Sequence, residues 1–302
     1  MYDVIIIGGG PAGLTASVYC SRAGLNVLLL ERLAAGGQAA TASKIENWPG
    51  TLEIAGIDLA MNMEQQAKKS GAKIIYDEVV SLELEGKTKL VKTRKETFES
   101  KSIILAFGAK KRTVNVPGEQ ELLGRGVSYC ATCDGAFFRN KTVAVVGGGN
   151  TAVEDALYLA AICPKVYLIN KNNELDTDIN LMQQIKENTV IEVVSDYKIT
   201  AIIGEKSVEQ VKIKGTQSGE EKSLDVKGVF LAVGTVPLNS LIVGKINLDD
   251  KGYVQSNEFC TTEVAGVFVA GDLRRKQLKQ VVTATADGAN AALSAQKFVK
   301  TL

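Results

Sequence analysis

Two segments of the chain share one pattern, in which a buried strand runs into a glycine-rich turn and then a helix. The segments are "DVIIIGGGPAG", which starts at Asp3, and "KTVAVVGGGNTA", which starts at Lys141. The turn positions are Gly8, Gly10 and Gly13 in the first segment, and Gly147, Gly149 and Ala152 in the second. Such a turn lets the backbone approach a dinucleotide pyrophosphate, which lies at the helix N-terminus. We therefore predict two nucleotide-type βαβ units.

The two units differ after their second strands. The first ends this strand with Glu31, about twenty residues beyond the glycines, where a carboxylate accepts hydrogen bonds from a ribose. The second ends it with Asn170, and residues 170–178 hold one lysine and three acids, a formal charge of −2 (1 − 3). This window has neither the acid typical of NAD sites nor the arginines typical of NADP sites. A 2′-phosphate is disfavoured there, whereas NAD is less excluded because Asn170 can still bond a ribose.

The rest of the pattern predicts the domain organisation. Residues 73–100 suggest short antiparallel strands, and residues 102–109 and 228–237 each suggest a buried strand with glycine near its end. After residue 240 come a strand, a Gly-Asp turn and a long helix of small residues. We predict an α/β fold of two Rossmann-like (three-layer ββα) nucleotide-binding domains, the second inserted into the first. The expected first domain is residues 1–112 with 240–302, and the second is residues 113–239.

The stretch "VSYCATCDGAFF" places Cys130 and Cys133 three positions apart, directly before Asp134. A zinc site usually needs four Cys or His ligands, and the chain has no histidine and no second close cysteine pair. No metal site is therefore predicted. A structural disulfide does not suit a reducing compartment, so a redox dithiol is favoured. Dithiol exchange needs a proton donor, for which Asp134 is the candidate, although an aspartate before glycine is also a common turn residue.

Composition narrows the setting in which this dithiol works. The net charge is +1, which argues against a surface built for nucleic acid or membrane. No stretch reaches the roughly 20 apolar residues that span a bilayer, and the N-terminus lacks a basic region typical of signal peptides. We expect a cytoplasmic protein.

Together these motifs resemble the low-molecular-weight thioredoxin reductase family. The resemblance covers the whole chain through the first glycine turn, "GGQAA", "IENWPG", "GVSYCATCDGAFF", "GGGNTAVEDA" and "GVFVAGD". It implies FAD in the first domain, with Asp272 on the ribityl chain and Gln280 and Val281 by the pyrimidine edge. Taken alone, "GGQ" and Asp272 are equally well explained as loop residues. The residues expected around FAD are Gly8, Gly10, Pro11, Ala12, Gly13, Glu31, Arg32, Gly37, Gln38, Asn47, Gly108, Gly271, Asp272, Lys279, Gln280 and Val281.

The resemblance also implies how the dithiol works. Cys133 is expected to meet the flavin, Cys130 to attack the disulfide of thioredoxin, and Asp134 to donate the proton. The family resemblance further implies a homodimer whose second domain rotates, with residues 110–118 and 234–240 as hinges.

One departure from the family pattern concerns the electron donor. NADPH-dependent members carry a histidine and arginines where this chain has Asn170, Lys171 and Asn172. The chain looks more like the subgroup that takes electrons from reduced ferredoxin, an acidic protein. Two basic runs, residues 110–112 and residues 274–276 with Lys279, are candidates for docking it, although solvated surface explains such runs equally well.

Three other functions remain open. The first is an NAD(P)H-dependent thioredoxin-disulfide reductase. The second is another flavoprotein, similar to ferredoxin–NADP reductase or to alkyl hydroperoxide reductase, although the former normally needs no dithiol and the latter carries an extra N-terminal domain. The third, of a different class, is a redox-sensing flavoprotein that has lost turnover, against which the intact "CATCD" segment argues.

Overall fold

The computed structural model describes residues 1–42 and 44–302. It divides into two compact units, Met1–Lys110 with Val236–Leu302, and Lys111–Thr235. The chain passes between the units twice, at β7 (Ala109–Lys111) and β16 (Thr235–Pro237), and these two strands pair in a small sheet. Because β7 and β16 contain the crossing points, Lys111 and Arg112 belong to the second unit and residues 236–239 to the first.

The first unit is built on a seven-stranded sheet with the order β3-β2-β1-β6-β5-β4, to which β17 is added beside β6. The strands β1, β2, β3, β6 and β17 are parallel, whereas β4 and β5 form antiparallel pairs. The strands are β1 (Tyr2–Ile7), β2 (Val27–Glu31), β3 (Lys73–Tyr76), β4 (Val79–Glu83), β5 (Lys89–Thr93), β6 (Thr97–Leu105) and β17 (Val267–Val269).

Part of the predicted antiparallel segment is different in the structure. β3 is a parallel strand of the main sheet, in register with β2 from Lys73 to Tyr76. Residues 97–105, which the sequence suggested as the end of one strand and the start of another, form the single strand β6. Its first half pairs antiparallel with β5 and its second half parallel with β1 and β17, so one strand serves both parts of the sheet.

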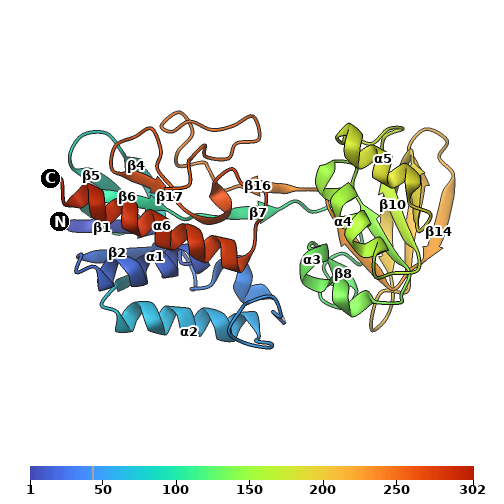
Figure 1. Cartoon of the computed structure of the whole chain (residues 1–302), viewed down its shortest axis with the longest axis horizontal. Coiled ribbons are helices and arrows are strands. Elements are labelled where there is room, and N and C mark those ends of the chain that lie inside the picture. The colour runs from blue at the N-terminus through green and yellow to red at the C-terminus, as the bar shows by residue number, and fades with distance from the viewer. Residues whose placement is uncertain (43) are drawn as a thin grey trace. The chain divides into compact units, whose positions relative to one another are not determined.

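The helices of the first unit pack on one face of this sheet. In Figure 1, α6 (red) lies alongside α1 (blue), and the two helices contact each other along their lengths. Strand residues alternate between two cores, because successive side chains point to opposite faces. Val4 and Ile6 join the helix-side core, while Ile5 and Ile7 join the core on the other face. The helical segments are α1 (Pro11–Arg22), η1 (Gly37–Thr41), α2 (Gly56–Lys69), η3 (Gly271–Leu273) and α6 (Val281–Val299).

The second unit has a parallel five-stranded sheet with the order β11-β10-β9-β15-β8 and an antiparallel sheet with the order β12-β13-β14. One face of the parallel sheet packs against α4 and its neighbours, and the other against the antiparallel sheet, which makes three layers. The elements are β8 (Val127–Ser128), α3 (Ala131–Asp134), η2 (Gly135–Phe138), β9 (Val143–Val146), α4 (Asn150–Ala160), β10 (Val166–Asn170), α5 (Ile179–Glu187), β11 (Ile191–Ser195), β12 (Tyr197–Ile203), β13 (Gln210–Gly215), β14 (Glu221–Asp225) and β15 (Gly228–Leu231).

The architecture is thus the predicted α/β fold of two Rossmann-like halves. Among residues 1–42 and 44–302, none of the helices combines the length and apolar character needed to cross a bilayer.

Candidate functional site

The first glycine turn forms a cradle at the start of α1. A Cβ on Gly13 would lie 1.9 Å from the Gly8 carbonyl oxygen, so only glycine permits this close packing of helix on strand. Gly10 is different, because a Cβ there would have only the Gly37 Cα nearby, at 4.0 Å. The space in front of Gly10 is therefore open at the helix N-terminus, where a pyrophosphate binds.

The carboxylate of Glu31 lies at the end of β2, beside this turn. It accepts hydrogen bonds from the backbone N–H groups of Gly9 (2.7 Å) and Leu33 (3.0 Å). As a carboxylate it has further lone pairs that can accept ribose hydroxyls. Neighbouring Arg32 is exposed, and its guanidinium lies 3.9 Å from Glu78.

Other predicted cofactor residues gather around the same turn. The Gly36 N–H donates to the Gly9 carbonyl at 2.7 Å, which holds the start of η1 on the glycine turn. The Gln38 amide bonds the Ala109 carbonyl, one residue after Gly108. The Asn47 amide donates to the Gln280 side chain at 3.1 Å, at the N-cap of α6 before Val281. Segments far apart in sequence are thus joined at one edge of the sheet.

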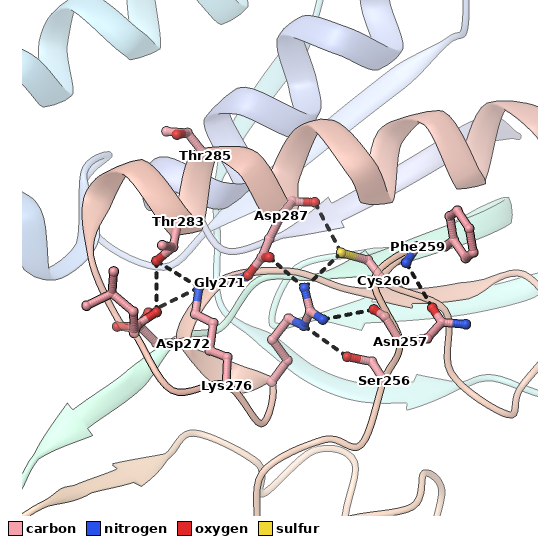
Figure 2. Close-up of polar contacts among 12 residues, drawn as sticks. Ser256, Asn257, Phe259, Cys260, Gly271, Asp272, Lys276, Thr283, Thr285 and Asp287 are labelled. Carbon is pink, nitrogen blue, oxygen red and sulfur yellow. Dashed lines mark hydrogen bonds and ion pairs between the residues drawn. The ribbon is translucent and has the colours of Figure 1, made fainter. Parts of the chain in front are cut away.

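Gly271 and Asp272 lie in η3, against the N-terminal end of α1. A Cβ on Gly271 would come within 2.9 Å of the Ala12 Cβ, so this turn approaches the glycine cradle closely. Figure 2 shows Asp272 beside Lys276, whose ammonium lies 3.9 Å from the Asp272 carboxylate. Asp287 accepts the Gly271 N–H at 3.1 Å and the Lys276 ammonium at 2.8 Å.

Asp287 also binds Arg274, at 2.6 Å from Nη1. The side chains of Arg274, Lys276 and Asp287 are only 8, 12 and 10% exposed, and Lys276 also lies 3.9 Å from Asp272, so two cations face two carboxylates in a largely buried cluster. Arg274 further donates to Ser256 Oγ, the Asn257 carbonyl and Cys260 Sγ. Through Asp287 of α6, the cluster holds the η3 turn in place.

This cluster removes Arg274 and Lys276 from the docking role expected for the second basic run, whereas Arg275 between them is exposed. Arg274 and Lys276 are occupied by Asp287 inside the first unit and cannot present their charges to a partner. Lys279 lies over the ring of Tyr253, 3.4 Å from its centroid. In the first run, Lys110, Lys111 and Arg112 are exposed, and Lys111 lies over the ring of Tyr129.

Cys130 and Cys133 form a disulfide at the start of the short helix α3. The predicted redox pair is therefore joined, and neither cysteine is part of a metal cluster. Indeed, over residues 1–42 and 44–302 no group of three or more His, Cys, Asp or Glu side chains is arranged to hold a metal ion.

Asp134 lies one residue beyond the disulfide and is held by a neighbouring hydroxyl. Ser128 Oγ donates to Asp134 Oδ2 at 2.5 Å, and the Cys130 N–H donates to Ser128 Oγ at 3.0 Å. Nothing in the sequence singled out Ser128. The available signal was a hydroxyl residue at the end of a short strand, two positions before the first cysteine.

Asp287 was also missed by the sequence interpretation. Its signal is an acid within an otherwise small and apolar helix, which has to find a buried partner. The partner, Arg274, lies thirteen residues earlier, and only the packing of α6 on η3 brings the two together.

The second glycine turn keeps the backbone of the first but is filled differently. Asn170 is buried at the end of β10, and its amide donates to the carbonyls of Asn172 (3.0 Å) and Glu174 (2.7 Å). Its side-chain oxygen accepts the Asn172 N–H at 3.3 Å. Both hydrogens of the amide are therefore donated to its own loop, so Asn170 has none left to donate to a ribose, and its oxygen keeps one lone pair.

The loop that follows Asn170 folds onto the second turn. The Asp176 N–H donates to the Gly148 carbonyl at 2.7 Å, and Asp178 accepts the Asn150 amide at 2.7 Å. The Asp176 backbone and the Asp178 carboxylate thus lie at the N-terminus of α4, where a pyrophosphate would bind in a working site. The negative charge of Asp178 opposes an incoming phosphate.

Comparison with known proteins agrees with this geometry. Residues 2–288 match the family model of the pyridine nucleotide-disulphide oxidoreductases. The thioredoxin reductase of Peptoclostridium acidaminophilum is 42% identical over 99% of this chain and 98% of its own length. The crystal structure of thioredoxin reductase from Streptococcus pyogenes MGAS5005 has a TM-score of 0.95 at 37% identity, covering 100% of this chain and 99% of that one.

A ferredoxin-flavin thioredoxin reductase from Clostridium acetobutylicum also matches, with a TM-score of 0.54, 29% identity and 100% and 99% coverage of the two chains.

Proteins of this family are flavoproteins, and FAD is the cofactor of this chain. The open space at Gly10 and the glycine cradle fit its pyrophosphate. The chain belongs to the pyridine nucleotide-disulphide oxidoreductases and, within them, to the thioredoxin reductase family.

Proposed function

We propose that this protein reduces the disulfide of thioredoxin through FAD and the Cys130/Cys133 pair. The observation that carries the proposal is the disulfide at the start of α3, with a carboxylate one residue beyond it. The names of the relatives support thioredoxin as the substrate. These relatives are called thioredoxin reductases, and this chain matches them over almost their whole length.

The proposed reaction is a pair of thiol–disulfide exchanges. The Cys130 thiolate attacks one sulfur of the thioredoxin disulfide, which forms a mixed disulfide and releases the other sulfur as a thiolate. The Cys133 thiolate then attacks Cys130 Sγ, which restores the Cys130–Cys133 disulfide and releases the second thioredoxin thiolate. Two electrons leave the enzyme dithiol and reduce thioredoxin. Asp134 is proposed to protonate a leaving thiolate, which keeps that step from reversing.

The first unit is proposed as the FAD domain and Lys111–Thr235 as the domain that carries the dithiol. The Gly8–Gly13 turn would hold the pyrophosphate, Glu31 a ribose and Asp272 the ribityl chain, with Gln38, Asn47 and Gln280 close to the flavin ring. FAD supplies the chemistry that links a donor to a disulfide when it is bound. The chain's own contribution is a cradle whose parts are already joined by hydrogen bonds.

For the electron donor we propose reduced ferredoxin. The second turn supports this, because Asn170 is engaged by its own loop and Asp176 and Asp178 lie beside the N-terminus of α4. An iron–sulfur protein needs only to approach the flavin and requires no nucleotide pocket. The exposed run Lys110–Lys111–Arg112 is a candidate for docking an acidic partner, and exposed Arg275 of the second run is another.

NADPH and NADH are the competing donors, since the names of most relatives specify no donor. A reductant screen decides between them: anaerobic bleaching of the flavin is followed with micromolar NADPH, NADH or reduced ferredoxin. We expect bleaching by ferredoxin to be at least tenfold faster. Faster bleaching by either nucleotide overturns the choice of donor but leaves the dithiol function intact. As a control, the flavin is photoreduced and oxidised thioredoxin is then added. This experiment needs none of the three donors.

The dithiol function has its own test. Cys133→Ser should keep the yellow colour while ending thioredoxin reduction, and should leave Cys130 able to trap thioredoxin as a stable mixed disulfide. Cys130→Ser should abolish reduction and trap nothing through position 130. Absence of a trapped adduct with Cys133→Ser would favour a redox-sensing flavoprotein over a reductase.

We also propose that the protein acts as a homodimer, as the family resemblance implies. Exposed apolar side chains on the α1 and α2 helices, among them Tyr19, Ile57 and Met61, are compatible with such an interface. Sedimentation equilibrium of the holoprotein tests it, and a mass of a single 32.2 kDa chain would contradict it.

A further inference from the structure

Ser128 connects the two groups on which the proposed exchange depends. It ends the short strand β8, and the residue is only 4% exposed. Its hydroxyl donates to Asp134 Oδ2 at 2.5 Å and accepts the backbone N–H of Cys130 at 3.0 Å. The Cys130 carbonyl lies 3.3 Å from the same oxygen.

A purely structural role accounts for only part of this arrangement. Serine side chains often accept an N–H two residues further on, which stabilises a turn, and the Cys130 contact is of this kind. The 2.5 Å contact with Asp134 reaches six residues along the chain, and its length is typical of a hydroxyl that donates to a carboxylate. The turn alone does not require it.

The hydroxyl has one hydrogen and two acceptors within reach. When Asp134 is a carboxylate, the hydrogen points to Oδ2. When the carboxyl carries a proton, that oxygen no longer needs a donor, and the hydrogen can turn to the Cys130 carbonyl. Ser128 keeps its own hydrogen throughout, so no proton passes through it.

We propose that Ser128 is a positioning residue, which aims the Asp134 carboxyl and accommodates both of its protonation states beside Cys130. The inference deepens the proposed function and rests on the role of Asp134 in it. Ser128 acts through Asp134.

A double-mutant cycle tests the proposal with Ser128→Ala, Asp134→Asn and the combined variant. Each holoprotein is reduced with dithionite, freed of excess, and mixed with oxidised thioredoxin in a single-turnover experiment, so the natural donor plays no part. We expect Ser128→Ala to slow the exchange about tenfold when Asp134 is present, and less than twofold in the Asp134→Asn background.

Two results would overturn the inference in distinguishable ways. If Ser128→Ala slows the reaction by the same factor in both backgrounds, Ser128 acts independently of Asp134, and the proposed reductase function survives. If Asp134→Asn reacts within twofold of the unmodified protein, the role of Asp134 fails and that of Ser128 fails with it.

Two further variants separate positioning from folding. Ser128→Thr keeps a hydroxyl at the same place and should restore the rate to within twofold. Ser223→Ala makes the same change on the exposed face of β14 and should have no effect. Flavin absorbance and thermal unfolding confirm that each variant is folded, and Ser128→Gly replaces the alanine variant if that one does not fold. A threonine variant as slow as the alanine variant would contradict the hydroxyl role.

Discussion

The two glycine turns have nearly the same backbone and offer different chemistry. The Gly8 N–H donates to Leu30 at 2.9 Å, and the Gly147 N–H donates to Ile169 at 3.0 Å. In each unit a later loop closes on the turn through one N–H at 2.7 Å, from Gly36 to Gly9 and from Asp176 to Gly148. The duplicated fold therefore extends to individual hydrogen bonds.

The side chains on these matching frames decide what each turn can hold. The first loop brings Gly36 and Gly37, which leave the space before Gly10 open. The second brings Asp176 and Asp178 to the equivalent place. The strand-end residue differs as well, because Glu31 only accepts hydrogen bonds whereas the Asn170 amide is used by its own loop. A Rossmann backbone is thus no evidence of a ligand until the closing loop has been inspected.

The largest difference between the two turns should be in the unfolding free energy contributed by the aspartate that braces each turn. The first is braced by buried Asp287, the second by exposed Asp178. Asp287→Ala leaves Arg274 buried without its carboxylate, which costs about 3–5 kcal/mol of unfolding free energy. Asp178→Ala should cost less than about 1 kcal/mol, because its pair is solvated. Denaturant unfolding of both variants measures the contrast, and equal losses would show that the two supports are equivalent.

A second pair of variants tests the open space in front of Gly10 and its equivalent at Gly149. Gly10 and Gly149 have φ angles of −75° and −93°, which alanine also adopts. The Gly10→Ala methyl would occupy the space for the pyrophosphate, so we expect FAD affinity to fall about 10- to 100-fold, or about 1.4–2.7 kcal/mol. Gly149→Ala should leave both FAD binding and thioredoxin reduction unchanged. Fluorescence titration of apoprotein with FAD measures the first effect, and turnover the second.

The outcome for Gly149 also bears on the donor. If Gly149→Ala slows turnover with NADPH or NADH while reduced ferredoxin works as before, then the second turn does receive a nucleotide. Both turns would then bind a nucleotide, and they would differ only in their affinity for it.

A third contrast between the units concerns pH. At the position of α4 where α1 has buried Ala16, the second unit has Asp155, and burial together with nearby Glu154 raises its pKa to about 7. Its unfolded pKa is near 3.8, so the folded state binds more protons between these values. The unfolding free energy should therefore fall as pH rises from about 4 to about 7.

Asp155→Ala gives the second unit the residue of the first and should flatten this slope. Urea unfolding at pH 5, 6 and 8 measures it for both proteins. An unchanged slope would show that other groups set the pH dependence. Glu154→Gln, which removes the neighbouring charge and keeps Asp155, should flatten the slope only slightly.

Most of the α/β frame could be predicted from sequence because its signals are local. Runs of β-branched residues before glycines mark β1 and β9, and both strands lie where these runs occur. The sheet position of β3 could not be predicted, because a four-residue strand has the same pattern whether it pairs with β2 or starts an antiparallel hairpin. Its partner is decided by packing between distant segments.

The candidate site likewise has one part that the local sequence predicts and another that depends on packing between distant segments. Cys130 and Cys133 are adjacent enough in sequence for their spacing to indicate the disulfide that forms. The pairing of Arg274 with Asp287 depends on how α6 packs on η3, so the sequence offered only a run of basic residues. Ser128 escaped notice because its importance lies in the geometry of one hydroxyl, which residue type alone does not specify.

The insertion of one unit into the other sets an order for synthesis. A ribosome completes residues 111–235, with all strands from β8 to β15, before it has made β17 and α6. Until then the helix-side core of the host unit lacks α6, and β6 lacks its neighbour β17. The nascent chain therefore carries a finished insert on an unfinished host, and protection of exposed apolar surface during translation matters most for its earliest residues.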